Sequence, residues 1–145
     1  MIRDSDKLRP HERLEVWRDA MTLVESVYRI TGRFPENERL GLTMQLRRAA
    51  VSVPSNIAEG AARRSRSEYV RFLSIARGSL AEMTTQLEIA HRLGFADTDS
   101  AMAELLDRTF ARLNALIRSL DPSPRKLREV PALYESRIPN PESHA

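Results

Sequence analysis

The stretch from Gln45 to Gly60, QLRRAAVSVPSNIAEG, limits the possible folds most, because polar residues border the apolar face of its predicted helix. On a wheel of about 3.6 residues per turn, the polar side chains fall within an arc of about 80°. They are Gln45, Arg48, Ser52, Asn56 and Glu59, beside an apolar stripe of Leu42, Leu46, Ala49, Val53 and Ile57. A buried polar group without a hydrogen-bond partner costs about 1–3 kcal/mol. The row therefore indicates either a satisfied structural network or a site for a ligand or a nucleic acid.

We favour a structural network as the interpretation of this polar row. Arg48 is expected to pair with Glu59, or with Glu82 of the following helix, and Asn56 is expected to complete the network. Replacing Arg48 by alanine would then leave a buried carboxylate unpaired, at a cost of about 3–5 kcal/mol.

Apolar residues recur at helical spacing in four segments, which predicts an all-α fold. The expected helices cover residues 11–31, 36–62, 66–93 and 98–120. Ser65 and Glu68 form a plausible capping box for the third helix, Gly94 follows its end, and Asp97 and Asp99 supply acidic caps for the fourth. Short connections between four such helices predict an up-down-up-down antiparallel four-helix bundle.

The bundle is assigned to residues 11–121, between a polar N-terminal arm at residues 1–10 and a C-terminal tail at residues 122–145. The tail is rich in proline, which opposes regular structure, so we expect it to be flexible. No run of about 18 apolar residues occurs, and the N-terminal residues are charged where a signal peptide is apolar. We therefore expect a cytoplasmic protein that does not contact a membrane.

Two of the predicted helices carry a second apolar row, beyond the single stripe of about 100° that one core requires. A monomer would expose such a row, so we expect a homo-oligomer. The candidate interface residues lie on the first and third helices and are Val16, Leu23, Val27, Ile30, Ile75, Gly78, Ile89 and Leu93.

Chemistry that would support catalysis is not evident in the sequence. Glu88 and His91 form one Glu-x-x-His motif, but a di-iron site in a four-helix bundle needs a second such motif and two further glutamates. The other histidines, His11 and His144, lie near the ends of the chain, and there is no cysteine. A nucleophile elbow and a phosphate-binding glycine loop are also missing. We expect no metal site, no cofactor and no enzymatic activity.

Arginines are concentrated between residues 62 and 77, where only Glu68 opposes them. The candidate nucleic-acid-binding residues are Arg63, Arg64, Arg66, Arg71 and Arg77. The first three lie in the predicted turn between the second and third helices, where guanidinium groups can reach phosphates. Aromatic side chains for base stacking are missing, because Tyr69 and Phe72 are predicted to face the core. The alternative is a solvated loop of arginines that binds nothing.

Three segments of the chain, LEVWRDAM, FPENERLGLTMQLRRAAVSVPSNIAEG and EYVRFLSIARGSLAEMTTQLEIA, resemble the four helix bundle protein family. That family was first noticed as reading frames within intervening sequences of bacterial 23S ribosomal RNA genes. It is similar in fold to the accessory variability proteins of diversity-generating retroelements. The resemblance runs from about Leu14 to about Phe95. It implies a four-helix bundle that assembles into a ring of five chains, a pentamer.

The arginine cluster and the resemblance together favour a non-enzymatic oligomer that binds nucleic acid, either RNA or an RNA–DNA hybrid, as an accessory factor. The alternative is a protein–protein scaffold with no nucleic-acid role. Its protein partner would contact the VPALY segment of the tail or the outer face of the fourth helix.

Overall fold

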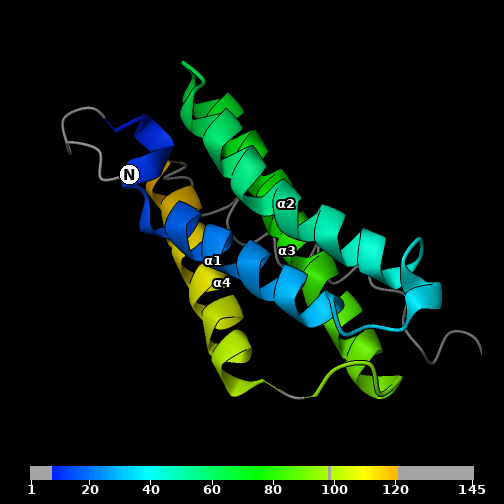
Figure 1. Ribbon diagram of the computed structural model, residues 1–145. Helices are drawn as coiled ribbons and strands as arrows, with labels where there is room; N and C mark the ends of the chain where they lie inside the picture. The colour runs from blue at the N-terminus through cyan, green and yellow to red at the C-terminus, as the bar shows by residue number, and fades with distance from the viewer. Residues whose placement is uncertain (1–7, 98, 121–145) are drawn as a thin grey trace, which may run out of the picture.

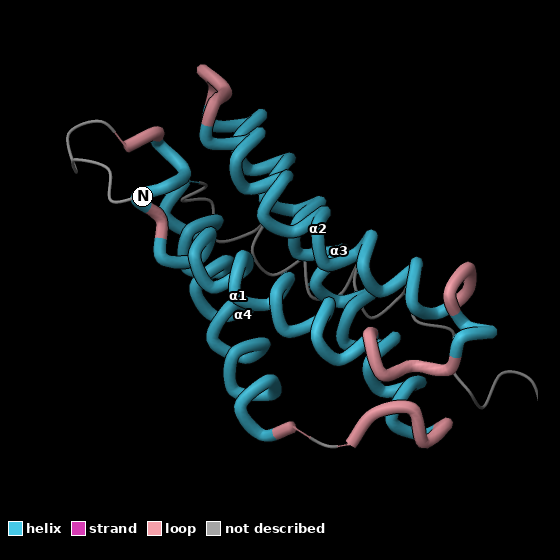
Figure 2. Tube along the Cα trace, viewed as in Figure 1, coloured by secondary structure: helices cyan, strands magenta, loops and turns pink. Residues whose placement is uncertain are grey.

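The computed structural model describes residues 8–97 and 99–120, and it folds this part of the chain into helices joined by loops (Figures 1 and 2). In chain order the elements are the 3-10 helix η2 (Pro10–Arg13), α1 (Glu15–Thr31), the 3-10 helix η3 (Glu36–Glu38), α2 (Leu42–Ala61), α3 (Arg66–Arg92) and α4 (Ser100–Leu120). The predicted tail and most of the predicted N-terminal arm lie outside the described residues.

Each helix packs against the next one along the chain, and α1 also packs against α4. These contacts close the four helices into an antiparallel bundle, in which the α2–α3 pair lies against the α1–α4 pair (Figure 1). The most extensive contact is the one between α2 and α3. The predicted all-α four-helix bundle is therefore confirmed.

The ends of the helices follow local signals. The Ser65 Oγ accepts a hydrogen bond from the backbone N–H of Glu68 at 3.2 Å, which caps α3. At the other end of α3, Gly94 adopts a φ of 77°, and the N–H of Phe95 donates to the carbonyl of Ala90 at 2.8 Å. This left-handed turn stops the helix. The Asp99 Oδ1 accepts from the N–H of Ala101 at 3.0 Å and caps α4.

The second helix begins later than predicted, at Leu42 and not at residue 36. Gly41 has φ −105° and ψ −114°, outside the helical region, so residues 36–38 form the separate turn η3. The Glu38 Oε2 accepts a hydrogen bond from the Leu42 N–H at 3.0 Å and so satisfies one of the free donors at the start of α2.

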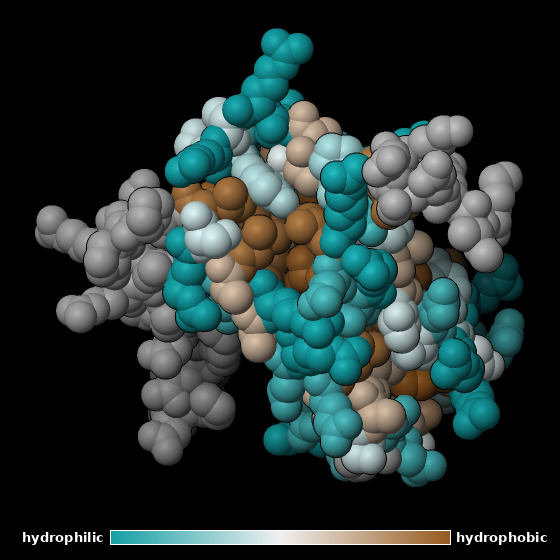
Figure 3. Space-filling model, turned by 90° about the vertical axis from the view of Figure 1, so that its left-hand side faces the viewer, coloured by the Kyte–Doolittle hydropathy of each residue, from teal (hydrophilic) through white to brown (hydrophobic). Residues whose placement is uncertain are grey.

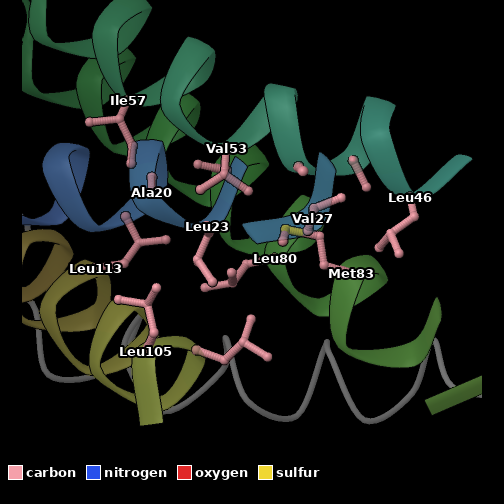
Figure 4. Close-up of a cluster of buried hydrophobic side chains, with 14 of the residues drawn as sticks. Ala20, Leu23, Val27, Leu46, Val53, Ile57, Leu80, Met83, Leu105 and Leu113 are labelled. Atoms are coloured by element: carbon pink, nitrogen blue, oxygen red, sulfur yellow. The ribbon is translucent and has the colours of Figure 1, made fainter. Parts of the chain in front are cut away.

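Side chains from all four helices converge on one hydrophobic core (Figure 4). Its members include Ala20, Leu23, Val27, Leu46, Val53, Ile57, Leu80, Met83, Leu105 and Leu113. On the face shown in Figure 3, apolar side chains also reach the surface, in a hollow framed by polar ones. Apolar surface thus remains uncovered by polar groups on this side of the bundle.

The predicted interface on α1 is wrong, because its residues belong to the core of the single chain. Val16, Leu23 and Val27 are 4% exposed or less, and Ile30 packs against the same core. The outward apolar residues of α1 are instead Met21 and Tyr28. The row that contains Val16, Leu23 and Val27 and the row that contains Met21 and Tyr28 are neighbours on the helical wheel. The apolar periodicity of the sequence therefore did not determine which row faces the core.

A cluster of ion pairs holds α1 against α4. The Asp19 carboxylate accepts from the Arg112 Nη1 at 2.6 Å and from the Arg108 Nη2 at 3.2 Å. The Asp19 side chain is only 10% exposed, whereas the two arginines are more open to solvent. Arg112 also pairs with the exposed Glu15 at 3.2 Å. Asp19 lies at the edge of the buried face of α1 and helps to set the rotation of that helix.

Asp19→Asn removes the charge from this cluster at nearly constant volume. We expect it to lower the free energy of unfolding by about 1–3 kcal/mol, because strong hydrogen bonds to a buried carboxylate are lost. The matched change Glu15→Gln affects an exposed pair and should cost less than about 1 kcal/mol. Urea unfolding followed by circular dichroism measures both values. Equal costs for the two variants would contradict the structural role given to Asp19.

Small residues allow α2 and α3 to approach each other closely. A Cβ atom built on Gly60 would lie 2.9 Å from the Tyr69 Cδ2 and 3.0 Å from the Phe72 Cβ, which is too close for normal packing. Further along the contact, the hydroxyl groups of Ser52 and Ser79 are hydrogen-bonded at 2.8 Å. Gly60 therefore sets the distance between the helices at the end of the pair that carries the predicted arginine cluster.

Gly60→Ala should destabilise the fold by about 1–3 kcal/mol through overpacking. Gly78→Ala, measured at a protein concentration where the chain is not assembled, is the matched control, because Gly78 lies within α3 and no described atom outside the nearby backbone of that helix lies within 4 Å of an added Cβ atom. That change should stabilise the helix by about 0.5–1 kcal/mol. Thermal or urea unfolding of both variants tests the pair, and a neutral Gly60→Ala would show that the two helices can move apart without cost.

Candidate nucleic-acid interface

The turn between α2 and α3 lies at one end of the bundle, at the top of Figure 1, where it extends past the start of α1. Residues 62–65 form this turn, and α3 begins at Arg66. Three of the five predicted nucleic-acid-binding arginines, Arg63, Arg64 and Arg66, lie here. We call Arg63, Arg64, Arg66 and Arg71 the basic tip.

Arg63 is the arginine of the basic tip whose charge is most fully matched. Its Nη2 lies 2.6 Å from the Glu59 Oε1, and its Nη1 lies 3.7 Å from the Glu68 Oε2. Its guanidinium carbon also stands 4.9 Å from the centre of the Phe72 ring. The pairs are partly exposed, so each contributes little to stability, but together they orient Arg63 along the helices.

Three arginines of the basic tip, Arg64, Arg66 and Arg71, form no salt bridge with any residue that the structure describes. Arg64 and Arg66 are exposed, and neither makes an ion pair or a side-chain hydrogen bond with any residue that the structure describes. Arg71, one turn into α3, is also exposed, and its guanidinium carbon lies 5.6 Å from the centre of the Phe72 ring. These guanidinium groups are open to solvent and can form forked contacts with an anion such as phosphate.

Arg77 does not join the basic tip. It points toward α4, where its Nη1 donates to the Asn114 Oδ1 at 3.0 Å. Burial lowers the pKa of the Arg77 guanidinium from its ordinary value. We therefore assign Arg77 to the contact between α3 and α4 and not to a phosphate site.

Tyr69 and Phe72 are poorly placed for stacking on bases. Both are partly buried, and Tyr69 lies against Gly60 at the α2–α3 contact. Burial also raises the pKa of the Tyr69 phenol. The Phe72 ring has guanidinium groups of Arg63 and Arg71 beside it. The basic tip thus offers charge without a free aromatic platform.

Only part of the predicted polar row forms a network. The Asn56 Nδ2 donates to the Ser52 carbonyl at 2.8 Å and to the Ser52 Oγ at 2.9 Å. Ser52 in turn bonds Ser79, as described above. Ser79 lies outside the predicted network, although it occupies a position in α3 where a small side chain allows close approach. This network links the two helices that carry the basic tip.

The predicted ion pairs of Arg48 are wrong. Glu59 pairs with Arg63, and within the described part of the chain Arg48 and Glu82 are exposed and make no salt bridge. Arg48 does not reach Glu59 because the two residues are separated by about 16 Å along the axis of α2, at 1.5 Å per residue. Gln45 is also exposed. Arg48 and Glu82 line one shallow groove between α2 and α3 without coming within salt-bridge distance of each other.

His91 lies near the end of α3 and contacts the chain just beyond that helix. Its Nδ1 lies 3.3 Å from the Ala96 carbonyl oxygen, in the turn that follows α3. In residues 8–97 and 99–120, no group of three or more His, Cys, Asp or Glu side chains is arranged to hold a metal ion. None of the described helices has the length and apolar character needed to cross a membrane.

No curated protein matches the chain. A family model described as the 23S rRNA-intervening sequence protein matches residues 12–118, a range that includes all four helices of the bundle except the last two residues of α4. The match covers more than half of the chain. The chain therefore belongs to the 23S rRNA-intervening sequence protein family.

Proposed function

We propose that this protein is a non-enzymatic accessory factor that binds RNA or an RNA–DNA hybrid through the basic tip. The observation that carries the proposal is the position of Arg64 and Arg66. Both are exposed at the end of the bundle, and neither is neutralised by another described residue. Membership of a family named for an intervening sequence of ribosomal RNA supports nucleic acid as the partner.

The chemistry of the basic tip favours contacts with the phosphate backbone over contacts with bases. Arginine forms paired hydrogen bonds with phosphate oxygens, and such contacts position a nucleic acid without reading its sequence. The partly buried Tyr69 and Phe72 do not provide a stacking surface for single strands. Binding is therefore expected to favour a structured backbone, with little sequence preference.

Assembly of several chains would multiply the modest charge of one chain, and we propose a homo-oligomer for this reason. Ile75, Ile89 and Leu93 support self-association, because they lie on the outer face of α3 and are 43%, 43% and 58% exposed. A ring, such as the pentamer that the family resemblance implies, would repeat the basic tip at regular intervals. Repetition strengthens binding because each added phosphate contact releases counterions.

The double variant Arg64→Glu, Arg66→Glu tests the proposed site. The wild-type protein should bind an RNA hairpin and an RNA–DNA hybrid of equal length at low salt, and should release both by about 0.3 M salt. The variant should lose this binding. If any binding remains, its slope of log affinity against log salt should be shallower by about 1.4–1.8 for each chain engaged. Fluorescence anisotropy over a salt series measures both quantities.

Arg29→Glu with Arg33→Glu is the matched control, because it reverses two exposed arginines at and just after the end of α1, at the opposite end of the bundle from the basic tip (Figure 1). Arg63 is left unchanged because its ion pairs with Glu59 and Glu68 would be disrupted as well. Equal loss of binding in both double variants would indicate only general attraction to net charge. Absence of any salt-sensitive binding by the wild type would overturn the nucleic-acid function in favour of the protein-scaffold alternative.

A further inference from the structure

A second feature of the surface lies along the outer side of α1 and α2, away from the turn that carries the basic tip. Here four large apolar side chains, Tyr28, Leu40, Met44 and Val51, line a shallow hollow of about 620 Å³. Leu40 is 79% exposed, and the other three are at least 40% exposed. We call these four residues, together with Arg39 and Arg48, the α1–α2 seam. Exposed apolar groups gathered in this way mark a contact surface.

The charges of the α1–α2 seam are all positive. Arg39 and Arg48 are exposed and have no ion-pair partner among the described residues, and no aspartate or glutamate lines the hollow. The neighbouring Arg47 is already engaged, because its guanidinium lies 4.5 Å from the centre of the Tyr28 ring and its Nε donates to the Thr31 Oγ1 at 2.8 Å. A surface that covers the seam should therefore combine apolar side chains with a free carboxylate.

The outer face of α3 has this combination. Ile75, Ile89 and Leu93 are exposed, and Glu82 stands between them without a salt bridge to any residue that the structure describes. Nothing lies within 4 Å of the place where a Cβ atom on Gly78 would stand, so another backbone can approach this face closely. We call Ile75, Gly78, Glu82, Ile89 and Leu93 the α3 face.

We propose that the α3 face of one copy docks on the α1–α2 seam of a second copy, with Glu82 paired to the second copy's Arg48. The inference rests on the proposed homo-oligomer and assigns the two surfaces that form it. A nucleic acid fits the seam poorly, because its phosphates would lie against apolar side chains and because Arg47 occupies the Tyr28 ring. The α3 face of a second copy supplies both an apolar row and the carboxylate of Glu82.

The proposed contact joins two different surfaces, which meet at the groove between α2 and α3 that Arg48 and Glu82 line. When it repeats head-to-tail from one copy to the next, it leaves one seam and one α3 face free at the ends of every open chain of subunits until a ring closes. The basic tip is not part of either surface. Assembly by this contact would leave Arg64 and Arg66 exposed on each copy.

Charge reversal in each surface tests the pairing. Arg48→Glu and Glu82→Arg each place like charges opposite each other, and each should raise the protein concentration needed for assembly by about tenfold or more. Light scattering should then approach the mass of one chain, 16.5 kDa, at concentrations where the wild type is larger. Arg118→Glu is the matched control on the outer side of α4 and should leave the mass unchanged. Circular dichroism checks that each variant is folded.

Mixing the two single variants separates pairing between chains from pairing within one chain. If Arg48 and Glu82 meet across an interface, the Arg48→Glu chain and the Glu82→Arg chain should form mixed species of two or more chains at concentrations where neither variant associates alone. A ring with an odd number of chains is not expected to close in the mixture, because two identical variants would meet at one junction. If they pair only within one chain, the mixture should stay dissociated while the doubly reversed chain recovers. That second pattern would overturn the proposal.

Two further outcomes would also overturn it. A wild type that remains at 16.5 kDa at high micromolar concentration does not use a second copy, and the seam would then serve a different protein. Loss of assembly in Glu82→Arg but not in Arg48→Glu would indicate that the α3 face contacts its own equivalent. RNA binding is measured in a separate experiment, and these variants leave Arg64 and Arg66 of the basic tip unchanged. An assembled wild type that binds no RNA would refute the proposed function and leave the interface standing.

Discussion

The close contact between α2 and α3 is the constraint on which the rest of the structure depends. Gly60 brings the two helices together beside Tyr69, and the hydrogen bond between Ser52 and Ser79 continues the contact toward the middle of the bundle. Because both helices lie so close, only a shallow groove separates their outer sides. The basic tip occupies one end of this pair. Arg48 and Glu82, which form no salt bridge with any residue that the structure describes, lie on its outer side. Small side chains between helices thus determine where the large charged ones are displayed.

The number and type of the helices could be predicted from the sequence because they depend on local signals. Ser65 caps α3, Asp99 caps α4, and the left-handed Gly94 ends α3, each through contacts within a few residues. The start of α2 was missed because Gly41 interrupts a segment whose apolar spacing is otherwise helical. Rotation of α1 was also missed. It depends on the pairing of Asp19 with α4, and no periodicity within α1 reports a contact with a distant helix.

The candidate site could be predicted only in part, for a related reason. Clustering of Arg63, Arg64 and Arg66 in a turn is visible from their spacing, and the structure brings them together. Whether each charge is free depends on its neighbours in space. Arg63 is held by Glu59 and Glu68, and Arg77 by Asn114 of another helix. The expected pairing of Arg48 with Glu59 failed because two residues on the same side of a wheel can still lie about 16 Å apart along the axis.

The ion pairs of Asp19 also have a consequence for the order in which the bundle assembles. They join Asp19 to Arg108 and Arg112, which follow it in the chain by 89 and 93 positions. By contrast, α2 and α3 are connected directly by the turn at residues 62–65. Closing a long loop costs more conformational entropy than closing a short one, so contacts between distant segments form late. The α2–α3 hairpin should therefore form before α4 docks on α1. On this pathway, interactions made by Asp19 are absent from the transition state and slow unfolding more than they speed folding.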